Sequence, residues 1–411
     1  MNRRNIFILL IFLVFVFFLI TNSALFNPIH ISNRTSFDDQ EILIKTLEVE
    51  ESETIEEMEE IEAIEEKTST LSLLAVGDIM FHMPQIKSAY ILEDGTYDFK
   101  DVFKYVKKYI ESADISIANL ETVVAGNDKG FFGYPTFNSP QETLEAIKYA
   151  GFDILVTANN HALDQGKEGL LNTIDFIEKE GMKNIGTNKK PDNQILIERI
   201  NDIEVALLAY SYGFNGLDYT LTEEEFSYMV NRIDEDRIKE DILKAKDMGS
   251  DVIVAYIHWG NEYEREPSDF QLELGRKMVE WGANIILGSH PHVIQRSEII
   301  EYDGRDNFII YSMGNFLSNQ REENINTKYV EDGVMVKIQI EKDFVKDETH
   351  IKEITYVPTW VRRYNDGKMK YEIIPIEDFL QDEALYSTIY EKERKRIEES
   401  YHSTLEIMAQ N

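Results

Sequence analysis

The sequence predicts a layered α/β protein, and two features of the chain indicate this fold. From Leu71 onward, short apolar runs rich in β-branched residues alternate with amphipathic stretches, which is the pattern of strands followed by helices. Most of the runs are continuously apolar, as expected of strands that are covered on both faces. With 411 residues, 43% of them hydrophobic, the chain can bury a sizeable core in one large or two modest domains.

Eight of the apolar runs are predicted as strands of the main domain, which is expected to span residues 71–341. They are 71–76, 115–118, 153–158, 205–210, 251–257, 283–287, 308–312 and 334–340. Two of the helices between them have recognisable ends. One has Ser139 as the predicted N-cap, Pro140 at its first position and Gly151 after its last turn, and the other begins near Ser268 in an S-x-x-Q pattern and runs towards Gly282.

The last part of the chain, residues 342–411, is predicted to be a β-hairpin followed by a charged tail. Residues 350–363 and 369–376 have the composition of strands, and Asn365, Asp366 and Gly367 supply the turn between them. The tail at 376–411 is expected to be helical in part. We predict no chemistry in this region.

The first part of the chain has the features of a membrane anchor. Residues 6–20 contain no polar side chain and the run continues to Phe26, which gives about the 20 residues needed to cross a bilayer. Arg3 and Arg4 precede it, so residues 1–5 are expected in the cytoplasm and the main domain outside the cell. A cleaved signal peptide is the alternative, but no clear A-x-A cleavage site follows the run. The sequence therefore predicts a single-pass cell-membrane protein anchored through residues 6–26.

Residues 27–70 are predicted to be an acidic linker or stalk. Between Asp38 and Lys67 there are 14 acidic and 2 basic residues, a local net charge of −12 within a chain of net charge −34. Ile55, Met58 and Ile61 recur every three residues, which favours a helical stalk, whereas the like charges favour a solvated linker. The acidic balance of the whole chain excludes nucleic acid as an expected partner, because phosphates are bound by Lys and Arg.

Cysteine is absent from the chain, so no disulfide or thiolate ligand can form and any metal must be bound by nitrogen and oxygen atoms. Candidates for these ligands follow several predicted strands. Asp78 comes directly after the first strand, and Asn119 and Glu121 end the second, where an extended chain would direct both side chains to one side. Each of these positions, taken alone, is equally typical of an ordinary polar strand end.

The motif TANNHALDQG places Asn160 and His161 at the end of the third strand, with Asp164 nearby. A helix N-cap would explain one asparagine but not the whole cluster. An amide ligand beside a proton-donating histidine fits it better, and Asp164 is then expected to orient the histidine or the loop.

Histidines follow two later strands. His258 ends the strand at 251–257, with Glu262 close behind it, and a buried structural histidine is the alternative there. In LGSHPHVIQ, Pro291 favours an extended geometry at His290, so His290 and His292 should point the same way and converge on one ion. These three and His161 are half of the eight histidines. Asn315 and Phe316 follow the next strand and are candidates for the pocket wall, although a simple Gly-Asn turn also explains them.

The ordered motifs GDIM, NLE, ANNHALDQG, HWGNE, GSHPHVIQ and YSMGNF, together with GYPTFNSP, resemble the capsule synthesis protein CapA family of poly-γ-glutamate production. The resemblance covers roughly residues 71–319. It implies the four-layer α/β/β/α sandwich of the calcineurin-like metallophosphoesterase superfamily. It also implies partners, namely the capsule synthesis machinery and poly-γ-glutamate.

The resemblance implies a metal site in this chain that takes one or two divalent ions, with Mn, Fe or Zn suited to a mixed nitrogen and oxygen set. The implied ligands are Asp78, Glu121, Asn160, His258, His290 and His292. His161 is the implied general acid for a reaction at a phosphorus centre. Asn119, Asp164, Glu262 and Asn315 are expected to support the ligands or line the pocket.

Two positions depart from the superfamily pattern. The superfamily's Asp-x-His motif has Met80 in place of histidine here, and the nearest histidine is His82. The acidic residue of the second motif is Glu121 within NLE rather than the usual Gly-Asp. One of the two metal sites therefore lacks an expected imidazole, unless His82 curls back to supply it.

Three functions fit these observations. The first is a membrane-tethered metal-dependent hydrolase or transferase that acts on a phosphorylated or amide-linked envelope substrate. The second is a non-catalytic subunit of a capsule synthesis complex that binds the polymer or a carrier. The third is a structural envelope protein whose metal only stabilises the fold. An anionic polymer would need a metal or a local basic patch on this acidic protein, and Arg362 and Arg363 are a candidate for such a patch.

Overall fold

The computed structural model describes residues 68–191 and 195–410. The predicted membrane anchor at 6–26 and almost all of the acidic linker at 27–70 lie outside these residues, and their prediction stands as made. Within the described ranges, none of the helices combines the length and the apolar character that crossing a membrane requires.

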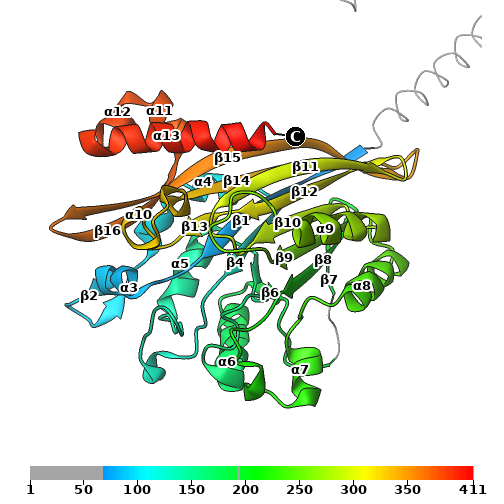
Figure 1. Ribbon diagram of the computed structural model, residues 1–411, viewed down its shortest axis with the longest axis horizontal. Coiled ribbons are helices and arrows are strands. Elements are labelled where there is room, and N and C mark those ends of the chain that lie inside the picture. Colours follow the sequence, from blue (N-terminus) through cyan, green and yellow to red (C-terminus); the bar gives the residue numbers. More distant parts are fainter. Residues whose placement is uncertain (1–67, 192–194, 411) are drawn as a thin grey trace, which may run out of the picture. The chain divides into compact units, whose positions relative to one another are not determined.

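Two β-sheets form the centre of the fold (Figure 1). The first has the strand order β16-β15-β14-β1-β4-β5-β6, and β13 (Asn315–Leu317) pairs with β1 beside it. Its other strands are β1 (Thr68–Ile79), β4 (Ile115–Leu120), β5 (Ile154–Val156), β6 (Lys183–Ile185), β14 (Asp332–Asp343), β15 (Glu348–Asp366) and β16 (Lys368–Pro375). Neighbours β1, β4, β5 and β6 are parallel, so the ends of these strands meet at one edge.

The second sheet has the order β11-β12-β10-β9-β8-β7. Its strands are β7 (Leu196–Ile200), β8 (Ile203–Ser211), β9 (Val252–His258), β10 (Ile285–Ser289), β11 (Ile294–Tyr302) and β12 (Arg305–Met313). The four central strands β8, β9, β10 and β12 are parallel, and the two edge strands are antiparallel to them. A small hairpin of β2 (Tyr90–Ile91) and β3 (Thr96–Tyr97) lies apart from both sheets.

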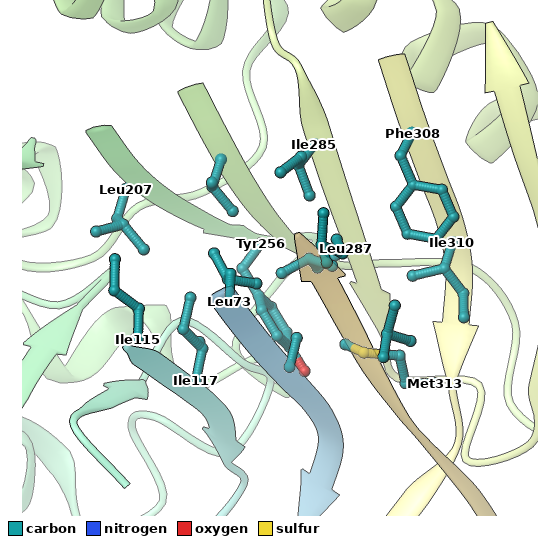
Figure 2. Close-up of a cluster of buried hydrophobic side chains, with 14 of the residues drawn as sticks. Leu73, Ile115, Ile117, Leu207, Tyr256, Ile285, Leu287, Phe308, Ile310 and Met313 are labelled. Atoms are coloured by element: carbon teal, nitrogen blue, oxygen red, sulfur yellow. The ribbon is translucent and has the colours of Figure 1, made fainter. Parts of the chain in front are cut away.

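The two sheets pack face to face through a common apolar core. Side chains such as Leu73 and Ile117 of the first sheet lie against Leu287 and Ile310 of the second (Figure 2). The first sheet's outer face is covered by α3 (Met83–Ala89), α4 (Lys107–Ile110) and α5 (Glu142–Ala150), and the second sheet's by α8 (Glu235–Asp247) and α9 (Asp269–Trp281). The order of layers is therefore helix, sheet, sheet, helix, the arrangement that the resemblance implied.

Further helices complete the domain around these layers. They are α6 (Gly166–Lys179), α7 (Glu223–Met229), α10 (Glu322–Ile325), α11 (Ile376–Gln381), α12 (Glu383–Ser387) and α13 (Glu391–Met408), with short 3₁₀ turns at 100–103, 127–129, 218–220 and 328–331. The longest, α13, lies against β15 and β11 (Figure 1).

All eight predicted strands of the main domain are present, with ends that differ by at most three residues. Six strands were not predicted: β2, β3, β6, β7, β11 and β13. Four of them, β2, β3, β6 and β13, are only two or three residues long, and the edge strands β7 and β11 mix polar and apolar residues. The predicted C-terminal hairpin is present as β15 and β16, and α11 to α13 follow it. These strands extend the first sheet beside β14, and the described residues 68–191 and 195–410 belong to one compact unit.

Only one of the two predicted helix starts is correct. Ser268 caps α9, because its hydroxyl accepts a hydrogen bond from the Gln271 amide in a capping box, and Gly282 ends the helix in a left-handed conformation. Ser139 does not cap α5. Its hydroxyl instead pairs with the Thr122 hydroxyl at 2.7 Å, and α5 begins three residues later at Glu142 without a side-chain cap.

Candidate metal centre

The first sheet brings oxygen-bearing side chains to the edge where its parallel strands end. Asp78 lies near the end of β1, Asn119 is in β4 with Glu121 just after it, and Asn160 is in the loop after β5, and all four side chains are buried. Gly77 makes this edge possible, since a Cβ there would lie 1.9 Å from the Gly314 carbonyl oxygen. The close approach lets the Asp78 amide bond that carbonyl at 3.0 Å.

A chain of amide hydrogen bonds fixes these loops to one another. The Asn119 side chain donates to Asp78 Oδ1 at 2.7 Å, and the Asn159 side chain donates to Asn119 Oδ1 at 3.0 Å. Asn159 Oδ1 in turn accepts from the His161 backbone amide at 3.1 Å. These side-chain bonds therefore add to the backbone pairing that joins the ends of β1, β4 and β5.

The second sheet brings imidazoles to the same place. His258 is the last residue of β9, and its Nδ1 lies 2.9 Å from the hydroxyl of Ser289, the residue it opposes in β10. Its Nε2 lies 2.8 Å from Asn160 Oδ1, which belongs to the first sheet's side. This contact joins the two halves of the site.

The rings of His290 and His292 lie near each other, but the backbone is not the extended one that was expected, and of the three candidate ligand sets in the described residues only the one with Glu262 contains both. Both have a left-handed backbone, with φ of +96° and +59°, and their ring centroids are 5.9 Å apart. The Pro291 carbonyl accepts a hydrogen bond from the Tyr263 amide at 2.7 Å, a tertiary contact that helps hold the turn. Non-glycine residues in this region are strained, and such strain is retained mainly at functional sites.

His292 makes direct contact with two residues from other strands. Its Nδ1 lies 3.0 Å from Asp78 Oδ2 and 3.2 Å from Asn315 Oδ1. The Asn315 side-chain amide donates to the Val330 carbonyl at 2.8 Å, which fixes its orientation. Asn315 therefore lies against a candidate ligand imidazole, consistent with the supporting role expected from the sequence.

Glu121 is the group in this cluster that most requires a cation. Its carboxylate is fully buried, and neither oxygen has a hydrogen-bond partner among the described residues. Its Oε1 lies 3.6 Å from His258 Nε2 and 3.8 Å from His292 Nε2, so the carboxylate lies between these two imidazoles. Burial, together with the nearby Asp78 carboxylate, raises the pKa of Glu121 well above its usual value.

Three sets of side chains offer ligand atoms within 4.8 Å of one another. They are Asp78 with Glu121 and His292, Glu121 with His258 and His290, and Glu262 with His290 and His292. The first two sets are buried and share Glu121, and the third includes the exposed Glu262. All the donors are imidazole nitrogens and carboxylate oxygens, so the residues present fit a divalent ion of borderline hardness.

Two of the histidines, His258 and His290, are in the protonation state that a metal needs. Burial lowers the pKa of His258 well below its usual value, and burial together with the nearby His292 lowers the pKa of His290 to about 3. Both imidazoles are therefore neutral at neutral pH, which is the form that binds metals. His290 Nδ1 has no hydrogen-bond partner among the described residues.

His161 is held as an oriented imidazole at the edge of the cluster. Its Nδ1 lies 2.7 Å from Asp164 Oδ2, which also accepts a hydrogen bond from the Phe137 amide at 2.7 Å. A proton on Nδ1 directed at this carboxylate leaves Nε2 available to exchange a proton. Asp164 thus orients His161, which is the role expected from the sequence.

The imidazole that the superfamily's first motif would supply is not replaced by a neighbouring residue. Met80, at that position, is buried and carries no nitrogen ligand. His82 is the N-cap residue of α3, and its Nδ1 accepts a hydrogen bond from the Asn319 amide at 3.3 Å. None of the three candidate ligand sets among the described residues includes His82.

Two residues that shape the site, Tyr212 and Asn215, were not predicted from the sequence. The ring of Tyr212 stacks on His258 with a centroid separation of 6.2 Å and lies 4.5 Å from His290. The Asn215 side chain contacts both Asn160, at 3.3 Å, and His161, at 3.5 Å. The Phe-Asn-Gly sequence around Asn215 signals a turn, but nothing in it indicates that the turn meets a strand end 55 residues away.

The fold and the site together define a two-sheet α/β protein with a buried, cysteine-free cluster of possible metal ligands. The comparison with known families is specific: residues 72–320, more than half of the chain, match the bacterial capsule synthesis protein PGA_cap, and the chain belongs to this family.

Two curated relatives agree with this assignment. The chain is 34% identical over 261 residues to the capsule biosynthesis protein CapA of Bacillus anthracis, a match that covers 61% of this chain and 60% of that protein. It is 27% identical over 326 residues to the PGA biosynthesis protein CapA of Bacillus subtilis (strain 168), covering 74% of this chain and 82% of that one. The chain thus matches less than two thirds of the length of the first relative.

Solved structures similar to this chain include the calcineurin-like phosphoesterase YfkN of Bacillus subtilis, with a TM-score of 0.40 and 16% identity over 71% of this chain and 90% of that one. A phosphatase of Mycoplasma pneumoniae is similar at a TM-score of 0.44 and 13% identity, covering 71% of this chain and 94% of that one.

Proposed function

We propose that this protein is a membrane-anchored, external component of poly-γ-glutamate capsule synthesis or export whose buried cluster is a metal-dependent hydrolase or transferase site of the phosphoesterase type. The observation that carries the metal site is the Glu121 carboxylate, buried without a hydrogen-bond partner among the described residues and lying between the imidazoles of His258 and His292. An isolated buried carboxylate is costly, and a bound cation removes that cost.

In this proposal two divalent ions, Mn, Fe or Zn, would be held by the two buried sets that share Glu121. Asp78 and His292 complete one set, and His258 and His290 complete the other, with Asn160 beside His258. When bound, such ions polarise a phosphoryl oxygen and favour attack by water at neutral pH.

The protein's own residues would then orient the substrate and transfer a proton. His161, with Nδ1 fixed by Asp164, is placed to donate a proton from Nε2 to a leaving group. Asn215 contacts both His161 and Asn160, so it would keep the proton donor and the amide in fixed relative positions.

The test is the metal content of the full-length chain, measured per mole of protein, together with hydrolysis of bis(p-nitrophenyl) phosphate with added Mn²⁺. We expect about two ions in the wild type. In His161→Ala we expect the same metal content and a fall in turnover of about 10²- to 10⁴-fold, the usual contribution of a general acid. Unchanged turnover in His161→Ala would remove the general-acid role.

A second candidate function is supported by Met80. Because this buried residue stands where the superfamily has an imidazole, one of the two sites has fewer nitrogen ligands. The alternative is a polymer-binding subunit of the capsule synthesis complex without turnover. One bound ion, no hydrolysis, and retained binding of a γ-linked glutamate oligomer would favour this alternative.

A further inference from the structure

A cavity of about 740 Å³ lies beside the candidate metal centre, in the loop that leads from β8 to α7. Two of its lining residues, Tyr212 and Asn215, are also in contact with the metal-centre residues. The Tyr212 ring lies against His258 and His290, and Asn215 contacts Asn160 and His161. A molecule whose reacting group lay at the metal centre would therefore have room for its adjacent part in this cavity.

Aromatic side chains form much of the cavity's lining. Phe214 and Phe226 pack edge to face at 5.8 Å, and Tyr212 and Tyr219 are 39% and 80% exposed. Such exposure of two tyrosines at one cavity means that their faces are available to the aliphatic part of a ligand.

Charged side chains of both signs line the same cavity and are not paired with one another. Arg232, Asp218 and Glu223 are lining residues, and within the described part of the chain no ion pair of 4.0 Å or less involves any of the three. Unlike the many surface charges of this chain that form ion pairs, these are free to bind a ligand that carries both charges.

We propose that this cavity binds the amino-terminal unit of an acidic, amide-linked chain. Arg232 would bind its carboxylate, Asp218 or Glu223 its ammonium group, and the tyrosine faces its methylene groups. Interior units of a γ-linked glutamate chain carry a carboxylate but have an amide nitrogen, so only the chain end offers both charges. The inference rests on the proposed role in poly-γ-glutamate capsule synthesis or export, since that polymer is an acidic, amide-linked chain.

The experiment is calorimetric titration of the full-length chain with a synthetic γ-linked tri-glutamate, either with a free amino terminus or N-acetylated. We expect acetylation to weaken binding about tenfold, the usual effect of losing one hydrogen bond to a charged group. Equal affinity for the two forms would overturn the proposal, because recognition would then not involve the ammonium group.

Substitutions test which side chains bind the carboxylate and the ammonium group of the ligand. We expect Arg232→Ala to weaken binding of both forms about tenfold, and the double variant Asp218→Asn, Glu223→Gln to bind both forms equally. Arg305→Ala is the matched control, because Arg305 is also exposed and lines a different cavity. Wild-type affinity in Arg232→Ala, or an equal loss in Arg305→Ala, would refute the assignment.

Metal content separates this inference from the proposed function. Metal binding and phosphodiester hydrolysis by the wild type, without any preference for the free amino terminus, would refute the subsite alone. A clear preference in a protein that binds no metal would support the subsite and refute the metal-dependent activity.

Discussion

The two sheets contribute different chemistry to the same site. The strand ends of the first sheet supply oxygen atoms, from Asp78, Glu121 and Asn160, whereas those of the second supply nitrogen atoms, from His258, His290 and His292. Neither sheet carries a complete buried ligand set, since each of the two buried sets draws on both sheets. The candidate metal centre is therefore a property of how the sheets pack together.

The two halves also differ in how they are held. The oxygen side is fixed by a chain of amide hydrogen bonds through Asn119 and Asn159. The nitrogen side depends on two left-handed residues and on contacts across the interface, such as that between His292 and Asp78. We expect the first side to keep its geometry without metal and the second side to depend more on the ion.

The largest loss of metal affinity should follow removal of an imidazole that contacts a residue of the opposite sheet. In His292→Ala we expect metal affinity to fall by more than about 100-fold, because even residues that only support metal ligands contribute 10- to 100-fold. The measurement is metal content per mole after dialysis against graded chelator concentrations. His350→Ala is the control, because His350 lies on β15 with its side chain 50% exposed. An unchanged metal content in His292→Ala would show that the ligand assignment is wrong.

Glu121→Gln tests the oxygen side with an almost isosteric change. Metal affinity should fall at least about tenfold, because a carboxylate shared by both buried sets becomes a neutral amide. The metal-free variant should be more stable than the metal-free wild type by about 1 to 3 kcal/mol, because the buried carboxylate without a partner is removed. Urea unfolding with and without chelator measures both effects, and a loss of stability in the metal-free variant would contradict the argument.

The central strands and the sheet edge that carries the site could be predicted from the sequence. Continuous apolar runs identify the central strands, and polar residues just after them identify the edge. Asp78, Glu121 and His258 were found in this way. The left-handed geometry at His290 and His292 could not be predicted, since the local preference before Pro291 favours an extended backbone and a tertiary contact from Tyr263 helps to stabilise another.

The residues missed by the sequence analysis share one cause. Both belong to the loop after β8, from which Tyr212 meets His290 after β10 and Asn215 meets Asn160 after β5. The sequence motifs do not encode these contacts between distant segments. The local sequence pattern predicted Ser139 as a helix cap. In the structure its hydroxyl instead forms a hydrogen bond with the hydroxyl of Thr122 in another loop.

A third prediction concerns His82, an imidazole on the oxygen side that belongs to none of the candidate ligand sets. Burial lowers its pKa to about 4, and its Nδ1 accepts a backbone hydrogen bond. The folded protein therefore loses stability as the pH falls from about 6.5, where an unfolded histidine binds a proton, to about 4. The loss is at most about 3 kcal/mol from this residue.

In His82→Gln the acid-dependent part of this loss should disappear, because glutamine can accept the same hydrogen bond and does not titrate. The free energy of unfolding, measured by urea at pH 7 and pH 4.5 with chelator present, should fall less in the variant than in the wild type. Parallel pH profiles for the two proteins would show that His82 is not the titrating group.

The smallest expected effect compares the helices that cover the two sheets. Ser268→Ala removes the side-chain cap of α9 over the second sheet and should cost about 1 kcal/mol. Amide hydrogen exchange should speed up at Gln271, whose backbone N–H loses its acceptor. Ser139→Ala is the matched change near α5 over the first sheet, and there the first helical turn should exchange at the wild-type rate, because the Ser139 hydroxyl bonds Thr122 and not the helix. Faster exchange in the first turn of α5 would restore Ser139 as a cap.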